Sequence, residues 1–220
     1  MILKKKEKKN ARRGFTLIEL MVVVAIMLIM TGVIFFNYNS FNDSMLLTNS
    51  AYDLSLSIRQ AQVYGTAVRE GTGWTPVSPI DANSYNNFAY AYGMHFDTSD
   101  PTGFSLFVDN GSANGAYDPG VDSKLQTYVF QRGIKVEKLC VSYNGAPCYP
   151  VTSLDITFLR PNPESRISAS DTATSFSCDP INNPVCGSAT IILQNANGSM
   201  TKAVVVSPTG QISVKNDPTP

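Results

Sequence analysis

The sequence has few of the residues, and none of the motifs, on which most catalytic sites are built. Its 220 residues include one histidine, one tryptophan and four cysteines. It contains no Walker-type phosphate loop, no HExxH pair for zinc and no GxSxG nucleophile elbow. The single histidine, His95, lies in a segment that alternates like a strand, so we expect a structural role for it. We therefore expect no enzyme and no catalytic residue.

Charge is also scarce, and its two signs are separated along the chain. Lys and Arg number 17, Asp and Glu number 17, and charged residues make up 15% of the sequence. Residues 1–14 hold seven of the basic residues and one acidic residue, which leaves a body with 10 basic and 16 acidic residues, net −6. Binding to a nucleic-acid backbone needs clustered Lys and Arg. The acidic body therefore argues against nucleic acid as a partner.

A long apolar run follows the basic residues. Within residues 15–36 every side chain is strongly apolar except Thr16, Glu19, Thr31 and Gly32. A helix of this length spans about 33 Å, enough to cross a hydrocarbon core of about 30 Å. The preceding positive charge predicts a cytoplasmic N-terminus and an exported remainder, as in an uncut signal anchor. A mid-membrane acid costs about 2.5–3.5 kcal/mol, so Glu19 calls for a functional explanation.

The stretch GFTLIE at residues 14–19, behind the basic leader, resembles the processing site of type IV prepilins and type II secretion pseudopilins. In that family a prepilin peptidase cuts after the glycine and methylates the new amino terminus. The resemblance therefore implies cleavage between Gly14 and Phe15 and N-methylation at Phe15. It also implies that Glu19 meets the amino terminus of a neighbouring subunit, where a low dielectric strengthens the attraction between opposite charges.

The same resemblance implies a location and a set of partners. The chain would be a single-pass protein of the inner (cytoplasmic) membrane with an exported head, and afterwards a subunit of an extracytoplasmic filament. Its partners would be prepilin peptidase, other pilin or pseudopilin subunits, an inner-membrane assembly platform and the lipid bilayer. Its domains would be a leader over residues 1–14, a transmembrane and assembly helix over 15–36, an amphipathic continuation over 37–70 and a β-rich head over 71–220.

The helical pattern continues beyond the membrane segment. Apolar residues recur at alternating steps of four and three: Leu47, Ala51, Leu54, Ile58, Ala61, Gly65 and Val68. Polar residues between them predict a wet opposite face. We expect one helix from about Phe15 to Arg69, weaker at Thr31-Gly32 and at Asn37–Asp43. Four stripe positions also resemble the head-packing helix of the GspH/FimT group of minor pseudopilins: Leu54, Ile58, Ala61 and Val68.

The remainder of the chain reads as short strands bounded by turn residues. The expected strands are Tyr90–Phe96, Phe104–Asp109, Leu125–Phe130, Ile134–Val141, Leu154–Leu159, Ala189–Gln194, Met200–Ser207 and Gln211–Val214. Asn197-Gly198 is a hairpin signal between two of them. Helix followed by strands indicates an α+β fold, with the long helix packed on an antiparallel sheet or sandwich. Gly71–Asn87 and Arg160–Gly187 are expected to be long loops, either partner-binding or surface decoration.

The four cysteines form two C-x7-C segments, each rich in turn residues. Four cysteines allow three pairings, and the sequence does not decide among them. The spacing favours two local bridges, Cys140–Cys148 and Cys178–Cys186, each stabilising by about 2–3 kcal/mol. A four-cysteine zinc site is the alternative, although such sites have shorter spacings.

One acidic, glycine-rich stretch could hold calcium. Its candidate ligands are Asn110, Ser112, Asn114, Asp118 and Asp122. The spacing follows that of an EF-hand loop until the twelfth position, where valine replaces the bidentate acid. An ordinary Asx- and Gly-rich hairpin loop explains the same residues. No other cofactor is expected.

Two non-enzymatic functions fit these observations. The first is a minor pilin or pseudopilin assembled into a filament through its N-terminal helix. The second is a binding module displayed on such a filament, for DNA uptake or adhesion. DNA-uptake members of the GspH/FimT group carry a Gly-Arg-x-Arg motif near the C-terminus, and residues 210–213 read GQIS here, with both arginines missing. The sequence does not distinguish a pilus from a secretion pseudopilus or a competence filament.

Overall fold

The structure is a computed structural model that describes residues 14–67, 90–110, 114–180 and 185–216, with the side chains of residues 36–40 excluded. The chain divides into two compact units, Met1–Asn42 and Asp43–Pro220. One helix, α1 (Leu17–Thr66), contributes to both of them. The loop expected at Gly71–Asn87 lies outside the described residues.

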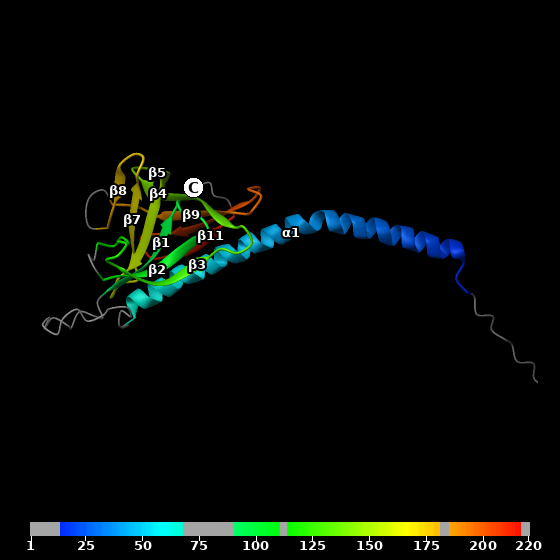
Figure 1. Cartoon of the computed structure of the whole chain (residues 1–220), viewed down its shortest axis with the longest axis horizontal. Coiled ribbons are helices and arrows are strands. Elements are labelled where there is room, and N and C mark those ends of the chain that lie inside the picture. Colours follow the sequence, from blue (N-terminus) through cyan, green and yellow to red (C-terminus); the bar gives the residue numbers. More distant parts are fainter. Residues whose placement is uncertain (1–13, 68–89, 111–113, 181–184, 217–220) are drawn as a thin grey trace, which may run out of the picture. The chain divides into compact units, whose positions relative to one another are not determined.

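Eleven strands are found among the described residues (Figure 1), and all of them belong to the second unit, called the head below. In chain order they are β1 (Ala91–Asp97), β2 (Gly103–Asp109), β3 (Ser123–Val129), β4 (Lys135–Tyr143), β5 (Ala146–Val151), β6 (Ser153–Phe158), β7 (Ser165–Asp171), β8 (Phe176–Cys178), β9 (Ala189–Gln194), β10 (Thr201–Val206) and β11 (Ile212–Lys215).

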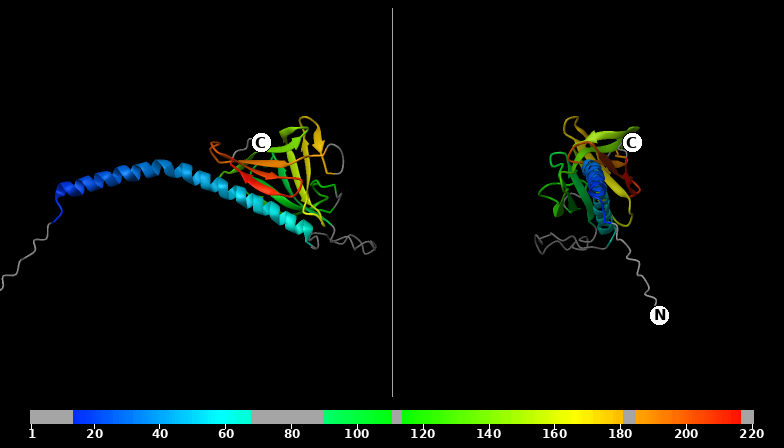
Figure 2. Two further views of the ribbon diagram at one scale, coloured as in Figure 1. Left: turned by 180° about the vertical axis from the view of Figure 1, so that it is seen from behind. Right: turned by 90° about the vertical axis from the view of Figure 1, so that its right-hand side faces the viewer.

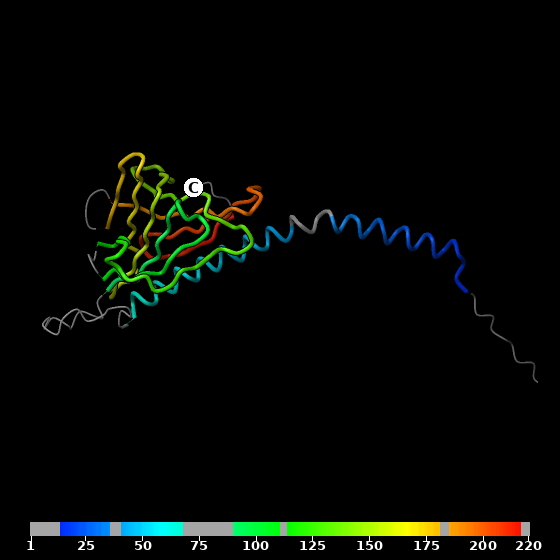
Figure 3. The backbone as a smooth tube through the Cα atoms, in the orientation of Figure 1, coloured from blue at the N-terminus to red at the C-terminus, as the bar shows by residue number. Residues whose placement is uncertain are grey.

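The first unit contains the part of α1 that begins at Leu17, drawn in blue in Figure 3. No proline interrupts it, and the helix passes through Thr31-Gly32, where we expected weaker structure. The hydroxyl of Thr31 donates to the carbonyl of Met27 at 2.7 Å. This bond satisfies a polar group inside an apolar helix without an outside partner.

The head is built from two antiparallel sheets and the second part of α1. One sheet has the strand order β3-β2-β1-β6-β7-β8 and the other β11-β10-β9-β4-β5. The left view of Figure 2 shows the cyan part of the helix running along the head. The expected α+β class, a long helix packed on antiparallel sheets, is therefore confirmed.

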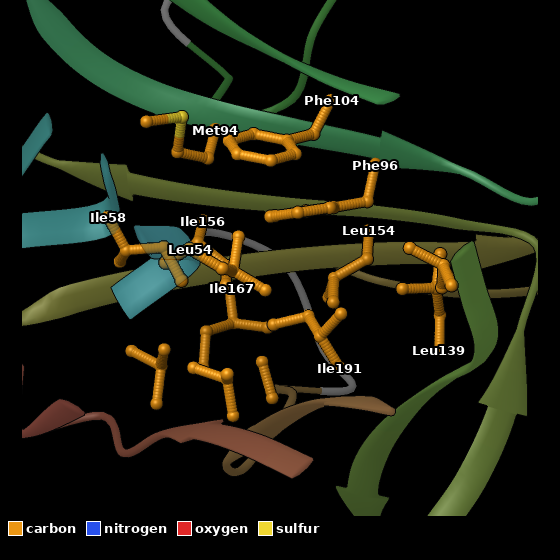
Figure 4. Packing of buried hydrophobic residues seen from close by; sticks show 14 of the residues in the cluster. Leu54, Ile58, Met94, Phe96, Phe104, Leu139, Leu154, Ile156, Ile167 and Ile191 are labelled. Carbon is orange, nitrogen blue, oxygen red and sulfur yellow. The ribbon is translucent and has the colours of Figure 1, made fainter. Parts of the chain in front are cut away.

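The core of the head is shared by the helix and both sheets. Figure 4 shows Leu54 and Ile58 of α1 among side chains from the two sheets, such as Ile156 and Ile191. All four are completely buried. Gly65 continues the same face, and a β-carbon there would collide with the backbone carbonyl of Phe158. The spacing of the helical stripe therefore predicted the side of α1 that enters the core.

Three strands lie where the sequence indicated loops. β5 follows a tight turn at Asn144-Gly145 and forms an edge of its sheet. Its two prolines are typical of a loop, but an edge strand tolerates proline. β7 and β8 occupy the expected loop Arg160–Gly187, so that prediction was wrong for these residues. β7 alternates apolar residues with serines, and both its faces are partly covered. Such burial depends on tertiary packing, so composition alone does not indicate it.

The remaining expectations fit more closely. Asn197-Gly198 lies in the turn between β9 and β10, as the hairpin signal predicted, and Gly198 has a positive φ of 70°. The helix begins at Leu17 and ends at Thr66, slightly inside the expected range, whose last residues from Val68 onward are outside the described part.

Candidate processing and assembly site

The Gly14-Phe15 bond lies in an open, non-helical segment immediately before α1. Residues 14–16 have no regular structure, and Phe15 is 84% exposed. Apart from Gly14 and its two chain neighbours, no atom of the described residues lies within 4 Å of the position that a β-carbon on Gly14 would take. A peptidase would therefore meet an accessible peptide bond here, without first unwinding the helix. The basic leader itself lies almost entirely outside the described residues.

Glu19 belongs to the first turn of the helix, and Thr16 is its N-cap. The backbone N–H of Glu19 donates to Thr16 Oγ1 at 3.3 Å, and that hydroxyl donates to Glu19 Oε2 at 3.4 Å. The pattern T-x-x-E is that of a capping box. An acid in the first turn also faces the positive end of the helix dipole.

Glu19 lies in the first turn of α1. Its carboxylate lies at one end of the apolar run, near the Gly14-Phe15 bond, and not at its centre. The geometry therefore shows one role for Glu19, as a capping residue at the start of the helix. That its charge meets the amino terminus of a neighbouring subunit stays a prediction.

The part of α1 from Leu17 to Phe35 is apolar and exposed on every side. Residues Leu17–Phe35 have a mean hydropathy of 2.7, and none of this segment is buried within the protein. Its length and composition are sufficient to cross a membrane. So large an exposed apolar surface is not stable in water and indicates a lipid or protein environment.

A second apolar stripe runs along the part of α1 that packs on the head. Met45, Tyr52, Leu56 and Val63 are about half or more exposed. At 3.6 residues per turn they fall within an arc of about 40° on the side away from the buried stripe. We expected this face to be polar and in contact with water. It is exposed and carries Asn49 and Arg59, but the four apolar side chains make it mixed in character. The sequence does contain the helical spacing of these four residues, at steps of seven, four and seven. The stronger pattern of the buried stripe was the one that we interpreted.

The structure joins Cys140 to Cys148 and Cys178 to Cys186. These are the two local bridges that the spacing favoured over the other pairings and over a zinc site. The Cα atoms are 4.9 Å apart in the first bridge and 5.5 Å apart in the second, within the usual range for disulfides. The first bridge joins β4 to β5, and the second clips the segment that follows β8.

The suggested calcium ligands are occupied in closing their own loop. Asn114 Nδ2 donates to Asp118 Oδ2 at 3.0 Å, and the backbone N–H of Asp118 donates to Asp122 Oδ2 at 2.8 Å. Asn110 hydrogen-bonds to the first residue of β3, and Ser112 is outside the described residues. Across residues 14–67, 90–110, 114–180 and 185–216, no three His, Cys, Asp or Glu side chains are grouped to hold a metal. Calcium binding stays a prediction without support from this geometry.

His95 attaches this loop to the sheet beneath it. Its Nδ1 lies 2.7 Å from Asp155 Oδ1 on the neighbouring strand β6, and its ring packs against Tyr117 of the loop. Burial raises the pKa of Asp155, although the His95 side chain and the Tyr117 backbone, both hydrogen-bonded to its carboxyl, act in the opposite direction. Every contact described for His95 is structural.

The comparisons with known proteins match this N-terminal site. A family model described as the prokaryotic N-terminal methylation motif matches residues 9–35. No curated protein and no solved structure matches the chain. The matched range covers the Gly14-Phe15 bond, Glu19 and the apolar helix. It supports a type IV pilin-like protein, anchored in a membrane by its N-terminal helix, processed by prepilin peptidase and assembled with other pilins as a structural subunit.

Proposed function

We propose that this chain is a minor pilin or pseudopilin, a structural subunit of a type IV pilus or a type II secretion pseudopilus, related to the GspH/FimT group. The observation that carries the proposal is the methylation motif at residues 9–35, which contains an apolar helix segment, Leu17–Phe35, that is exposed on every side. A protein that only needed a membrane anchor would require the helix but not the motif.

The proposed maturation starts on the cytoplasmic side of the inner membrane. Prepilin peptidase removes residues 1–14 by cutting between Gly14 and Phe15, and then methylates the amino group of Phe15. The accessible, non-helical Gly14-Phe15 segment suits that reaction. The cut places a new positive charge at the start of the helix, four residues before Glu19.

Assembly then follows from the two apolar surfaces of α1. Residues 15–36 move from lipid into contact with the corresponding helices of other subunits, and Glu19 meets the charged amino terminus of a neighbour. Along residues 37–70, the exposed stripe of Met45, Tyr52, Leu56 and Val63 offers a second contact. Residues 71–220 complete the exported head. Burial of the stripe would stabilise association by about 25 cal/mol for each Å² of apolar surface removed from water.

The decisive experiment identifies the amino terminus of the protein extracted from membranes. We expect intact mass and sequencing to give a chain that begins at N-methyl-Phe15 in cells with prepilin peptidase. In cells without the enzyme, and in a Gly14→Leu variant, we expect the leader to be retained. A leader retained in all strains would contradict the proposal and leave a signal-anchored exported domain.

A further inference from the structure

The head contains a cavity of about 500 Å³ that none of the features described so far uses. It lies between the turn joining β6 to β7, the second disulfide and the turn joining β10 to β11. The residues that matter below are Arg160, Pro161, Glu164, Arg166, Pro180 and Pro208. Segments distant in the sequence thus meet around one hollow, with apolar walls and two arginines.

The two arginines are unusual among the basic side chains of the head. The structure describes nine Lys and Arg residues after residue 42, and only Arg160, Arg166 and Lys202 are half-buried. Lys202 donates to Asn216 at 2.6 Å. Neither arginine side chain has a hydrogen-bond or ion-pair partner among the described residues.

A half-buried guanidinium without a protein partner has hydrogen-bond donors that no protein group satisfies. Its five N–H donors have lost part of their water, and a neighbouring anion would satisfy them with charge-assisted hydrogen bonds. Arginine is the side chain best suited to a planar carboxylate, which it binds in a two-pronged geometry. Two such groups on one cavity therefore define a site for an anion.

The other residues that line the cavity restrict the kind of anion that it can bind. Three prolines, Pro161, Pro180 and Pro208, provide rigid apolar walls. Glu164 is also in the lining, which would repel a ligand of high negative charge. The head as a whole is acidic, which disfavours a polyanion such as nucleic acid. A carboxylate carried on a peptide, with apolar groups beside it, fits these conditions.

We propose that this cavity binds an acidic segment of a partner protein, with Arg160 and Arg166 holding its carboxylates. The proposal concerns what the head recognises, and it does not depend on whether the N-terminal helix assembles into a filament. Glu164 limits the negative charge of the segment that the cavity can bind. The three prolines contact the backbone of that segment.

The proposal is tested with the full chain in phosphatidylcholine nanodiscs. The probe is a fluorescein-labelled, end-capped glutamate peptide of sequence Ala-Glu-Val-Glu-Ala, followed by fluorescence anisotropy. The same peptide with glutamine in place of glutamate is the uncharged comparison. The basic leader at residues 1–14 would itself attract an acidic peptide. A reference chain that carries Arg160→Gln and Arg166→Gln together measures that background.

We expect saturable binding of the glutamate peptide by the native chain above the reference, and no such binding of the glutamine peptide. Arg160→Gln and Arg166→Gln should each weaken this binding about tenfold, since each removes a charge-assisted contact. Glu164→Gln should strengthen it by removing repulsion. Lys138→Gln, which removes one exposed charge from β4, is the matched control and should leave binding unchanged.

Several results would overturn the proposal. If the native chain bound the peptide no more tightly than the reference chain with both arginines replaced, the cavity would not be the binding site. An equal loss of binding in Lys138→Gln would mean that the effect comes from general charge and not from the cavity. Tighter binding of a 12-base-pair DNA duplex than of the glutamate peptide would assign the cavity to a polyanion. Because the Glu164→Gln effect has the opposite sign to a folding defect, a gain in affinity there cannot arise from unfolding.

Discussion

The two units of this protein differ in the exposure of their apolar residues. In the first, the apolar side chains of Leu17–Phe35 are exposed to their surroundings. In the head, Leu47, Leu54 and Ile58 on the later part of the same helix are at most 1% exposed. Helix propensity does not distinguish the two parts. What differs is the environment, because the sheets provide the head with a core while the first part depends on lipid or on other subunits.

The largest expected effect tests this contrast directly. Leu54→Ala should lower the free energy of unfolding of the head by about 2–5 kcal/mol, because it leaves a cavity between the two sheets. Leu28→Ala, in the exposed segment, should change it by less than about 0.5 kcal/mol. Urea unfolding of the full chain in detergent micelles, followed by pulse proteolysis of the head, measures both. Equal effects would mean that the two units do not unfold separately.

The disulfides should sharpen the contrast, since both lie in the head. Replacing Cys140 and Cys148 together by alanine should lower the free energy of unfolding by about 2–3 kcal/mol, by releasing a loop of eight residues in the unfolded chain. The same replacement at Cys178 and Cys186 should act similarly. The membrane extraction of the protein should not change. A loss well below 1 kcal/mol would show that the strands, and not the bridges, hold these loops.

Glu19 provides the corresponding test of the first unit. Glu19→Ala removes both the capping contact and the charge, and we expect incorporation into sheared filaments to fall at least tenfold, with the stability of the head unchanged. Immunoblotting of filament and membrane fractions measures this incorporation. Glu19→Gln is the matched control, because glutamine still completes a capping box but carries no charge. If Glu19→Gln assembles normally, the role of Glu19 is capping and the proposed pairing with an amino terminus is wrong.

The features that could be predicted from the sequence are those encoded locally. The methylation motif, the buried stripe through Leu54 and Ile58 and the Asn197-Gly198 turn each depend on residues close together in the chain. The missed features depend on tertiary contacts. β7 is recognisable as a strand only once its serines are covered, and the two arginines face one cavity only because β6 and β7 form a hairpin beside the turn after β10.

The smallest expected effect concerns pH and again belongs to the head alone. Burial raises the pKa of Asp155 above its ordinary value of 3.8, so the folded state holds this proton more tightly than the unfolded state. Its contribution to stability is therefore complete below pH 3.8 and is lost as the pH rises through the raised pKa. One proton limits the slope to about 1.4 kcal/mol per pH unit. Asp155→Asn should flatten the unfolding free energy over that range.

Asp171 is the matched control for this pH dependence because its shift has the opposite sign. The hydrogen bond from the Thr174 side chain lowers the pKa of this exposed carboxyl below 3.8. Its contribution is present above pH 3.8 and disappears as the pH falls through the lowered pKa. Asp171→Asn should therefore change the slope of the unfolding free energy against pH only in that acidic range. If Asp155→Asn left the profile above pH 3.8 unchanged, the contacts from His95 and Tyr117 would outweigh burial. Asp155 would then carry its charge in the folded head at neutral pH at no cost in stability.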